Sequence, residues 1–290
     1  MHFMKETCSH NLETLETLVD TNTKLVALGA AANSCGSLTD IKTAVSIIKR
    51  ASEGGALVYV DAVHLAPHQL MDVRELGCDF LVCSAYKFCG PHYGALYGRA
   101  SVLQKLQPHK LAACTDLLPC PASNQSNRWE TGTLSFEAVA GFQAAVEYLA
   151  SIGVRSGLAL SSDSLRCRLE AGYQAIGEHE AEISRRFLYE ASTIPGLTVH
   201  GVTSVEAVHK RTPTFCLSLA GLSAPELTRR LVTRGVAAGA GHFYAAMFPE
   251  RMGLTEAGGF TRVGFFHYNT IQEVDTVLRI LRELSTQLVQ

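Results

Sequence analysis

The sequence has no excess of either charge and no long apolar run. Lysine and arginine number 25 against 27 aspartates and glutamates, so the formal net charge of −2 offers no strongly basic surface to nucleic acid or an acidic membrane. The apolar stretch 25–32 is among the longest, well short of the roughly 18 residues that cross a bilayer, and residues 1–10 lack the apolar core of a secretory signal. A hydrophobic content of 47% excludes wholesale disorder. We therefore expect a soluble, cytoplasmic protein without a nucleic-acid or membrane partner.

The nine cysteines show no paired spacing. None belongs to a C-x-x-C motif, so neither a zinc ribbon nor a thioredoxin-like site is supported. Several lie in apolar runs, where a reduced thiol behaves as a small hydrophobic group. We expect reduced, structural cysteines in a reducing compartment; they are Cys8, Cys35, Cys78, Cys83, Cys89, Cys114, Cys120, Cys167 and Cys216.

The first half of the chain alternates strand-like and helix-like segments. The apolar runs 24–30, 56–63 and 79–85 predict buried strands, and 93–97 is a further candidate. Apolar residues at helical spacing predict a helix over 37–51. This alternation is typical of a parallel or mixed sheet covered on both faces, whose ligands bind outside the carboxyl ends of the strands.

The second half begins with a break in this pattern. Residues 111–128 contain two prolines and a polar cluster, and we predict a long excursion or lid there. Helices are predicted over 137–150 and 165–189, the latter with one apolar stripe. The composition changes near 193–196, and the rest predicts a smaller α+β domain. Its strand candidates are 197–202, 214–219 and 260–265, with capping boxes at Ser223/Glu226 and Thr270/Glu273.

Two charged residues follow consecutive buried strands, Asp61 after the second and Lys87 after the third. A buried charge at a strand end is costly unless it is paired or coordinated, and a structural Asp61–Lys87 ion pair is one interpretation. The other is pyridoxal phosphate, which needs a lysine to form an imine and an acid to hold its pyridine nitrogen protonated. Ser84 can supply a phosphate contact, while Gly90 and Gly94 allow the backbone to approach closely.

A metal site is the third interpretation of this block. Asp61, His64 and His68 form a D-x-x-H-x-x-x-H cluster, in which a helix would place both imidazoles on one face. Pro67 lies between the histidines and opposes a helix there, so we expect no metal and a His68 satisfied within a turn.

The spacing of these residues resembles the class V aminotransferase family of fold-type I pyridoxal-phosphate enzymes, and most of all its cysteine-desulfurase-like branch. The similarity runs from about Leu12 to the C-terminus, and residues 84–91 (SAYKFCGP) are its most specific stretch. The resemblance implies an α/β fold: the remainder of a pyridoxal-phosphate-binding large domain over 1–155, with a mixed, mostly parallel sheet, a connecting long helix over 156–195, and a small C-terminal α+β domain over 196–290.

The resemblance also implies roles for individual residues around the cofactor. Lys87 would be the Schiff-base lysine and Asp61 the partner of the pyridine nitrogen. His64 stands where the family has Gln or His beside the phenolic oxygen. Ser84 would contact the phosphate, and Tyr86 occupies a position that is often His. Asn33 matches an asparagine near the cofactor and the substrate.

Three further positions follow from the same resemblance. The segment 128–133, which ends in Thr133, resembles the one that reaches the phosphate bound by the partner subunit, and it implies a homodimer with shared active sites. Arg262 matches the arginine that clamps the substrate α-carboxylate, a task for which a bidentate guanidinium is suited. His242 is either a proton shuttle near the cofactor or a loop histidine.

The chain departs from the family in two places. Tyr244 stands where a cysteine desulfurase carries its nucleophilic cysteine, and a tyrosine cannot accept sulfur as a persulfide. The chain also starts after the region that supplies the phosphate-binding helix terminus and the aromatic ring stacked on the cofactor, so we expect an N-terminally truncated large domain. We predict a pyridoxal-phosphate enzyme acting on an amino acid, without desulfurase activity by the usual route, and leave lyase, epimerase and aminotransferase outcomes open. The alternative is an inactive truncated pseudoenzyme or a dimerising fragment of the same fold.

Overall fold

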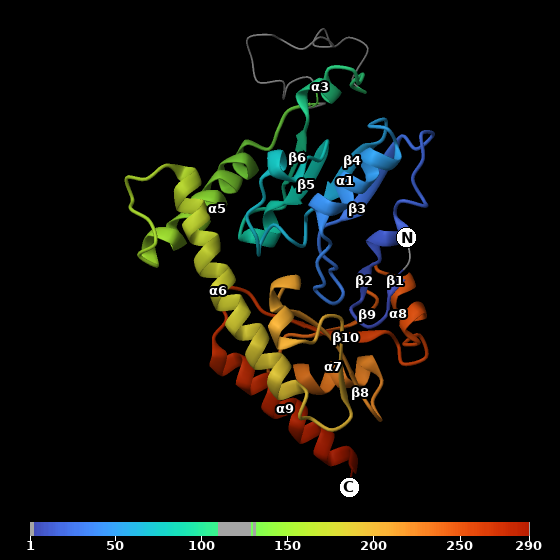
Figure 1. Ribbon diagram of the computed structural model, residues 1–290. Helices are drawn as coiled ribbons and strands as arrows, with labels where there is room; N and C mark the ends of the chain where they lie inside the picture. Colours follow the sequence, from blue (N-terminus) through green and yellow to red (C-terminus); the bar gives the residue numbers. More distant parts are fainter. Residues whose placement is uncertain (1–2, 110–128, 130–131, 290) are drawn as a thin grey trace.

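The structure is a computed structural model that describes residues 3–109, 129 and 132–289 (Figure 1). The predicted excursion over 111–128 lies outside the described residues. The elements, with η for a 3-10 helix, are in chain order β1 (Phe3–Met4), β2 (Ser9–His10), η1 (Leu12–Thr14), β3 (Leu25–Gly29), α1 (Ile41–Ala51), β4 (Leu57–Asp61), α2 (Val73–Leu76), β5 (Phe80–Ser84), η2 (Ala85–Phe88), β6 (Gly94–Gly98), α3 (Ala100–Leu103), α5 (Phe136–Arg155), α6 (Leu165–Ala191), β7 (Leu197–His200), η3 (Val205–Lys210), β8 (Thr214–Leu219), α7 (Ala224–Val232), β9 (Gly239–Gly241), α8 (Met247–Met252), β10 (Phe260–Gly264) and α9 (Ile271–Val289).

The first large sheet has the strand order β3-β4-β5-β6, with β6 antiparallel to β5 and the other pairs parallel. This confirms the predicted α/β fold with a mixed, mostly parallel sheet. The strands follow the predicted apolar runs within one or two residues at each end. The pairing sets Gly29 beside Asp61 and Asp61 beside Val82, so the carboxyl ends of β3, β4 and β5 share one edge of the sheet. Charged residues that follow these strands are thereby brought together.

Helix α1 covers this sheet with Ile41, Ala44, Val45 and Ile48, which are buried. It begins at Ile41, four residues later than predicted. Asp40 caps it, since Oδ1 accepts a hydrogen bond from the Thr43 amide at 3.0 Å. Ser37, the predicted start, instead bridges to Arg211 in the second half of the chain.

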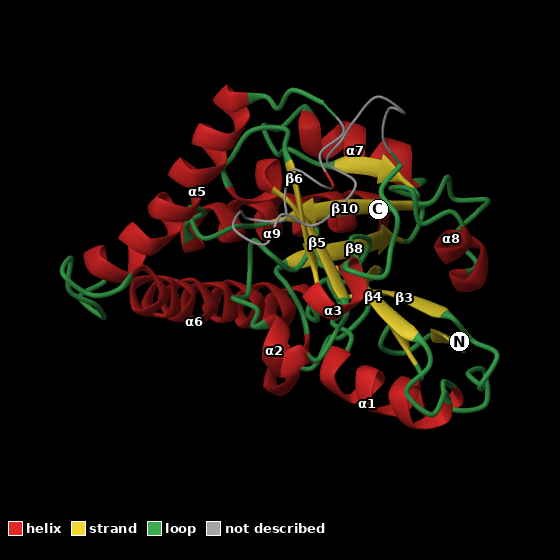
Figure 2. Ribbon diagram, turned by 90° about the horizontal axis from the view of Figure 1, so that it is seen from above, coloured by secondary structure: helices red, strands yellow, loops and turns green. Residues whose placement is uncertain are grey.

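Helices α5 and α6 pack side by side (Figures 1 and 2). Gly153 and Gly172 make the close approach feasible, because a Cβ on Gly153 would lie 2.4 Å from the Arg168 carbonyl oxygen and one on Gly172 would lie 2.3 Å from that of Leu149. The apolar stripe of α6 serves both halves of the molecule: Ile176 packs with α5, and Phe187 lies in the core of the second sheet. Leu165, the first residue of the predicted stripe, is exposed.

The second large sheet has the order β7-β8-β10-β9 with antiparallel pairing throughout. Helices α7 and α9 contribute to its core together with the end of α6. Of the two predicted capping boxes, Thr270/Glu273 forms with reciprocal hydrogen bonds at 2.7 and 3.2 Å. Ser223 caps α7, since its hydroxyl accepts from the Glu226 amide at 3.4 Å, but the Glu226 carboxylate binds Arg229 and Arg230 and does not complete the box. Figure 1 shows α6 running from the first large sheet down to the second. The exact domain limits at 155 and 195 stay predictions.

No helix in the described ranges is both long and apolar enough to span a membrane.

Candidate active site

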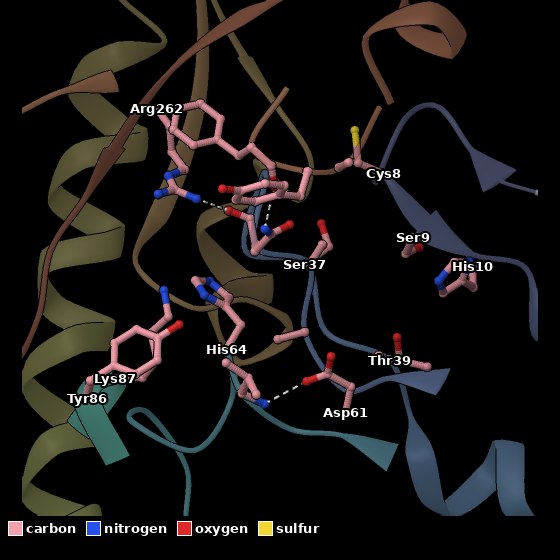
Figure 3. A pocket seen from close by; sticks show the side chains of 18 residues that line it. Cys8, Ser9, His10, Ser37, Thr39, Asp61, His64, Tyr86, Lys87 and Arg262 are labelled. Atoms are coloured by element: carbon pink, nitrogen blue, oxygen red, sulfur yellow. Dashed lines mark hydrogen bonds between the residues drawn. The ribbon is translucent and has the colours of Figure 1, made fainter. Parts of the chain in front are cut away.

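A cavity of about 440 Å³ lies at the carboxyl ends of the first sheet, and side chains from both halves of the chain line it (Figure 3). The structure brings six of the predicted site residues to it: Asn33, Asp61, His64, Tyr86, Lys87 and Arg262. They come from the turn after β3, the end of β4 and the segment after it, η2, and β10. In Figure 3 the Lys87 amine, the His64 ring and the Arg262 guanidinium point into the same space.

Asp61 is the last residue of β4. Its Oδ1 accepts a hydrogen bond from the Val63 amide at 2.9 Å, which orients the carboxylate at the strand end. Its Oδ2 has no hydrogen-bond partner in the part of the chain that the structure describes. One carboxylate oxygen is therefore free to bind a protonated nitrogen in the cavity.

Lys87 lies in η2, directly after β5. The structural Asp61–Lys87 ion pair that the sequence left open is not formed, and Nζ has neither an ion pair nor a hydrogen bond among the described residues; it lies 5.2 Å from the centroid of the Tyr86 ring. Burial, followed by the positive charge of Arg262, lowers the pKa of Lys87. A larger fraction of this amine is then in the neutral, nucleophilic form.

His64 is held by the second half of the chain. Its Nε2 lies 3.1 Å from the Thr214 hydroxyl and 3.3 Å from the Thr212 hydroxyl. Burial, with smaller effects of His68 and Arg262, lowers the pKa of His64 to about 3, so this imidazole is neutral at pH 7. A neutral ring can hydrogen-bond to an oxygen in the cavity without adding a positive charge.

His68 points away from the cavity and is buried against α6. Its Nδ1 lies 2.8 Å from Glu180 Oε2, so its partner comes from a distant helix and not from its own turn. Within the described ranges, no group of three or more His, Cys, Asp or Glu side chains is placed to hold a metal ion.

Arg262 connects three segments of the cavity wall. Its Nη1 donates to the Asn33 carbonyl oxygen at 2.8 Å, and its guanidinium carbon lies 3.9 Å from the centroid of the Phe243 ring. Asn33 Nδ2 in turn donates to the Phe243 carbonyl oxygen at 2.8 Å. The turn after β3, the segment after β9 and strand β10 thus position one guanidinium at the cavity.

Three predicted site residues do not line the cavity. Ser84 is half-buried at the end of β5, and its hydroxyl makes no hydrogen bond to any described residue. Thr133 is exposed ahead of α5, and Arg128, at the start of the same predicted segment, lies outside the described residues. His242 is exposed, and its Nδ1 accepts a hydrogen bond from the Tyr244 amide at 3.1 Å.

Residues from the start of the chain also reach this cavity, which no sequence pattern indicated. Cys8, Ser9 and His10, in and next to β2, line it together with Tyr244 (Figure 3). No motif marks them, and only the tertiary fold brings a thiol into the same cavity as Lys87.

The Aminotransferase class-V family model matches residues 3–165 and 155–277. The chain belongs to the class V aminotransferase family. Among its curated relatives, the Aminotransferase-like protein FGM3 of Gibberella zeae is 30% identical over 268 residues, 92% of this chain and 60% of the relative. A probable cysteine desulfurase of Borreliella burgdorferi is 26% identical, over 94% of this chain and 61% of its own. The chain therefore spans about three fifths of the length of these relatives.

Solved structures show the same fold. The apo cysteine desulfurase of Thermococcus onnurineus NA1 matches with a TM-score of 0.79 at 22% identity, over 98% of this chain and 65% of that one. The Escherichia coli cysteine desulfurase CsdA matches with a TM-score of 0.74 at 23% identity, over 96% and 63%. These likenesses confirm the predicted fold-type I architecture.

Class V aminotransferases depend on pyridoxal phosphate. The described residues fit the ring and the carbonyl carbon of this cofactor: Lys87 is an amine without a partner, Asp61 has a free carboxylate oxygen, and His64 is neutral. The two predicted phosphate contacts, Ser84 and Thr133, do not line the same cavity.

Proposed function

We propose that this class V aminotransferase family member binds pyridoxal phosphate through Lys87 and acts on an amino acid. The observation that carries the proposal is the convergence of Lys87, Asp61, His64 and Arg262, from four separate segments, on one cavity of about 440 Å³. In one cavity, the amine can bind the cofactor carbonyl, the acid can hold the pyridine nitrogen protonated, and the guanidinium can bind the α-carboxylate of an amino acid.

Asp61 and His64 are the residues that we assign to the cofactor ring. Bound pyridoxal phosphate supplies a pyridinium ring that withdraws electrons from the substrate Cα. Asp61, through its free oxygen, would hold a proton on the ring nitrogen, and His64 would hydrogen-bond the ring oxygen. Tyr86 and Asn33, which line the same cavity, would contact the cofactor. Ser84 as a phosphate contact stays a prediction.

The substrate side rests on Lys87 and Arg262. The Lys87 Nζ, with its pKa lowered, accepts the proton from the substrate Cα. Arg262 uses one donor on Asn33, so the rest of its guanidinium fork is left for the substrate α-carboxylate. His242 as a proton shuttle stays a prediction.

Tyr244 supports chemistry other than desulfuration by a loop cysteine. Its side chain lines the cavity and is 98% exposed, and its φ of 66° lies in the left-handed region. A phenol at this place cannot carry sulfur as a persulfide. We propose lyase, epimerase or aminotransferase chemistry at Cα or Cβ.

The alternative, an inactive protein that keeps the fold, is favoured by one observation. Ser84, the phosphate contact predicted within the chain itself, does not line the cavity with Lys87. Without protein contacts to its phosphate, the cofactor would bind only through its ring and its carbonyl carbon.

We further propose a homodimer, the usual state of family members. Thr133 lies outside its own cavity, as expected of a residue that serves a partner, and Phe136 beside it is 71% exposed. The seven described cysteines are all free, which agrees with a reducing compartment such as the cytoplasm.

The test is the visible spectrum of the 290-residue chain with added pyridoxal phosphate, before and after borohydride, followed by peptide mapping. We expect a visible band that borohydride removes, with cofactor mass fixed on the peptide that contains Lys87. Lys87→Ala should lose the band, whereas Lys105→Ala, an exposed lysine outside the cavity, should keep it. Absence of the band in the native chain would overturn cofactor binding and support the inactive alternative.

A further inference from the structure

Arg211 is a buried cation without a carboxylate partner. Its side chain belongs to a residue only 4% exposed, and no Asp or Glu forms an ion pair with it in the described ranges. Its guanidinium donates only to carbonyl oxygens, including those of Thr214 at 2.6 Å and Cys35 at 3.3 Å, and lies 4.2 Å from the Phe215 ring centroid. A buried charge of this kind calls for an opposite charge nearby.

The acidic groups that face Arg211 are three thiols. Cys8, Cys35 and Cys216 are all buried in one cluster, packed with Phe248 and Phe260. Their charges raise the pKa of Arg211, with Cys35 first, against the larger lowering by burial. Burial raises the pKa of Cys216, and the Cys35 side chain, followed by burial, raises that of Cys8. Cys35, whose pKa is lowered, is therefore the member of the cluster that can supply a negative charge to Arg211.

Cys8 and Cys35 form the close pair within this cluster. Cys35 Sγ lies 3.8 Å from the Cys8 carbonyl oxygen and 3.4 Å from the Ser37 hydroxyl, and Cys8 Sγ lies 3.5 Å from the Lys5 carbonyl oxygen. The Cys8 side chain and then Ser37 lower the pKa of Cys35 to about 6, and the Cys35 side chain raises the pKa of Cys8. The pair therefore ionises at Cys35 before Cys8.

The pair is also reachable from the cavity. Cys8 lines the cavity that holds Lys87, whereas Cys35 is fully buried behind it. Cys35 belongs to the same turn as Asn33, whose carbonyl oxygen accepts from Arg262. A covalent change at this pair would therefore act on the cavity wall.

We propose that Cys8 and Cys35 are a redox modification site, a thiol pair that low-molecular-weight disulfides oxidise to an intramolecular disulfide. In the singly ionised pair, Cys8 passes its proton to Cys35 and attacks one sulfur of the reagent, whose S–S bond breaks. The first thiolate leaves and takes the proton from Cys35. Cys35 then attacks Cys8 Sγ, forms the new S–S bond and expels the second thiolate. The pair loses two electrons, and the reagent is reduced to one thiol and one thiolate.

The test uses the full chain and glutathione disulfide, with the remaining thiols blocked by N-ethylmaleimide before tryptic mapping. The tryptic peptides 6–24, 25–42 and 212–229 each contain one cysteine of the cluster, Cys8, Cys35 and Cys216 respectively. We expect peptides 6–24 and 25–42 joined by a bond that dithiothreitol breaks. Cys8→Ser and Cys35→Ser should abolish the joined species, and Cys167→Ser, which removes an exposed thiol on α6, should keep it.

The peptide map of the unmutated chain tests whether the Cys8–Cys35 disulfide forms, even if a variant fails to fold. Blocked or glutathionylated Cys8 and Cys35 without a joined peptide would overturn the proposal. So would a bridge between 25–42 and 212–229, because it would make Cys216 the partner of Cys35.

Discussion

The packing of α5 on α6 offers a test in which two similar substitutions have opposite effects. Gly153 faces the backbone of α6, and a Cβ there would lie 2.4 Å from the Arg168 carbonyl oxygen and 2.7 Å from the Gly172 amide nitrogen. Both obstacles are main-chain atoms, so the helices must separate. Overpacking costs about 1–3 kcal/mol, and alanine recovers about 1 kcal/mol of helix propensity. The net expectation is that Gly153→Ala lowers the free energy of unfolding by up to about 2 kcal/mol.

Gly177→Ala is the matched control on α6. A Cβ at Gly177 would meet nothing within 4 Å, so only the gain in helix propensity remains. We expect this variant to be more stable by about 0.5–1 kcal/mol. Urea unfolding followed by far-ultraviolet circular dichroism measures both changes. If Gly153→Ala were as stable as Gly177→Ala, the close backbone contact between the helices would be refuted.

Two further predictions concern buried ionisable groups. The pKa of His64 is about 3 in the fold against an ordinary value of 6.5, so between these values the unfolded chain binds the extra proton. Stability should therefore fall with decreasing pH in this window by about 1.4 kcal/mol per unit from this residue, and urea midpoints of His64→Gln should show a shallower slope. Asp79 is buried and contacts Lys49 at 2.8 Å and Arg99 at 3.0 Å. Asp79→Ala should cost about 2–3 kcal/mol, less than for a fully buried pair because both cations reach water, whereas Arg279→Ala in an exposed pair should cost under about 0.5 kcal/mol by the same measurement. Equal effects of the last two variants would contradict this difference in burial.

Much of the fold was predictable because its signals are local. Apolar runs predicted β3, β4, β5 and β8 within one or two residues, and spacing predicted the long helix α6. The three-residue strand β9 was not predicted, since Gly239 and Gly241 carry no strand pattern and the strand exists only through pairing with β10. Local propensity cannot report such pairing.

The site was predictable where a residue's place follows from its own strand. Asp61 and Lys87 end adjacent strands, and the family motif identified Arg262, so all three were predicted to meet, as they do. Ser84 was predicted from the same resemblance, but it does not line the cavity. A motif gives the residue type and its neighbours in sequence, and it does not give the direction in which a hydroxyl points. Thr133, predicted to serve the partner subunit, stays a prediction.

The sequence by itself determined the alternation of strands and helices, the capping of α7 and α9, and the chemical types that gather at the strand ends. Each of these depends on neighbours within a few residues. Only the tertiary structure decided that His68 binds Glu180, that the Cys8, Cys35 and Cys216 thiols lie close enough to Arg211 to affect its pKa, and that Cys8 and Lys87 line one cavity. Except for Arg211 and Cys216, these residues are more than 70 positions apart. Which of them meet depends on how the whole chain packs and buries its polar groups, and local sequence patterns do not report that.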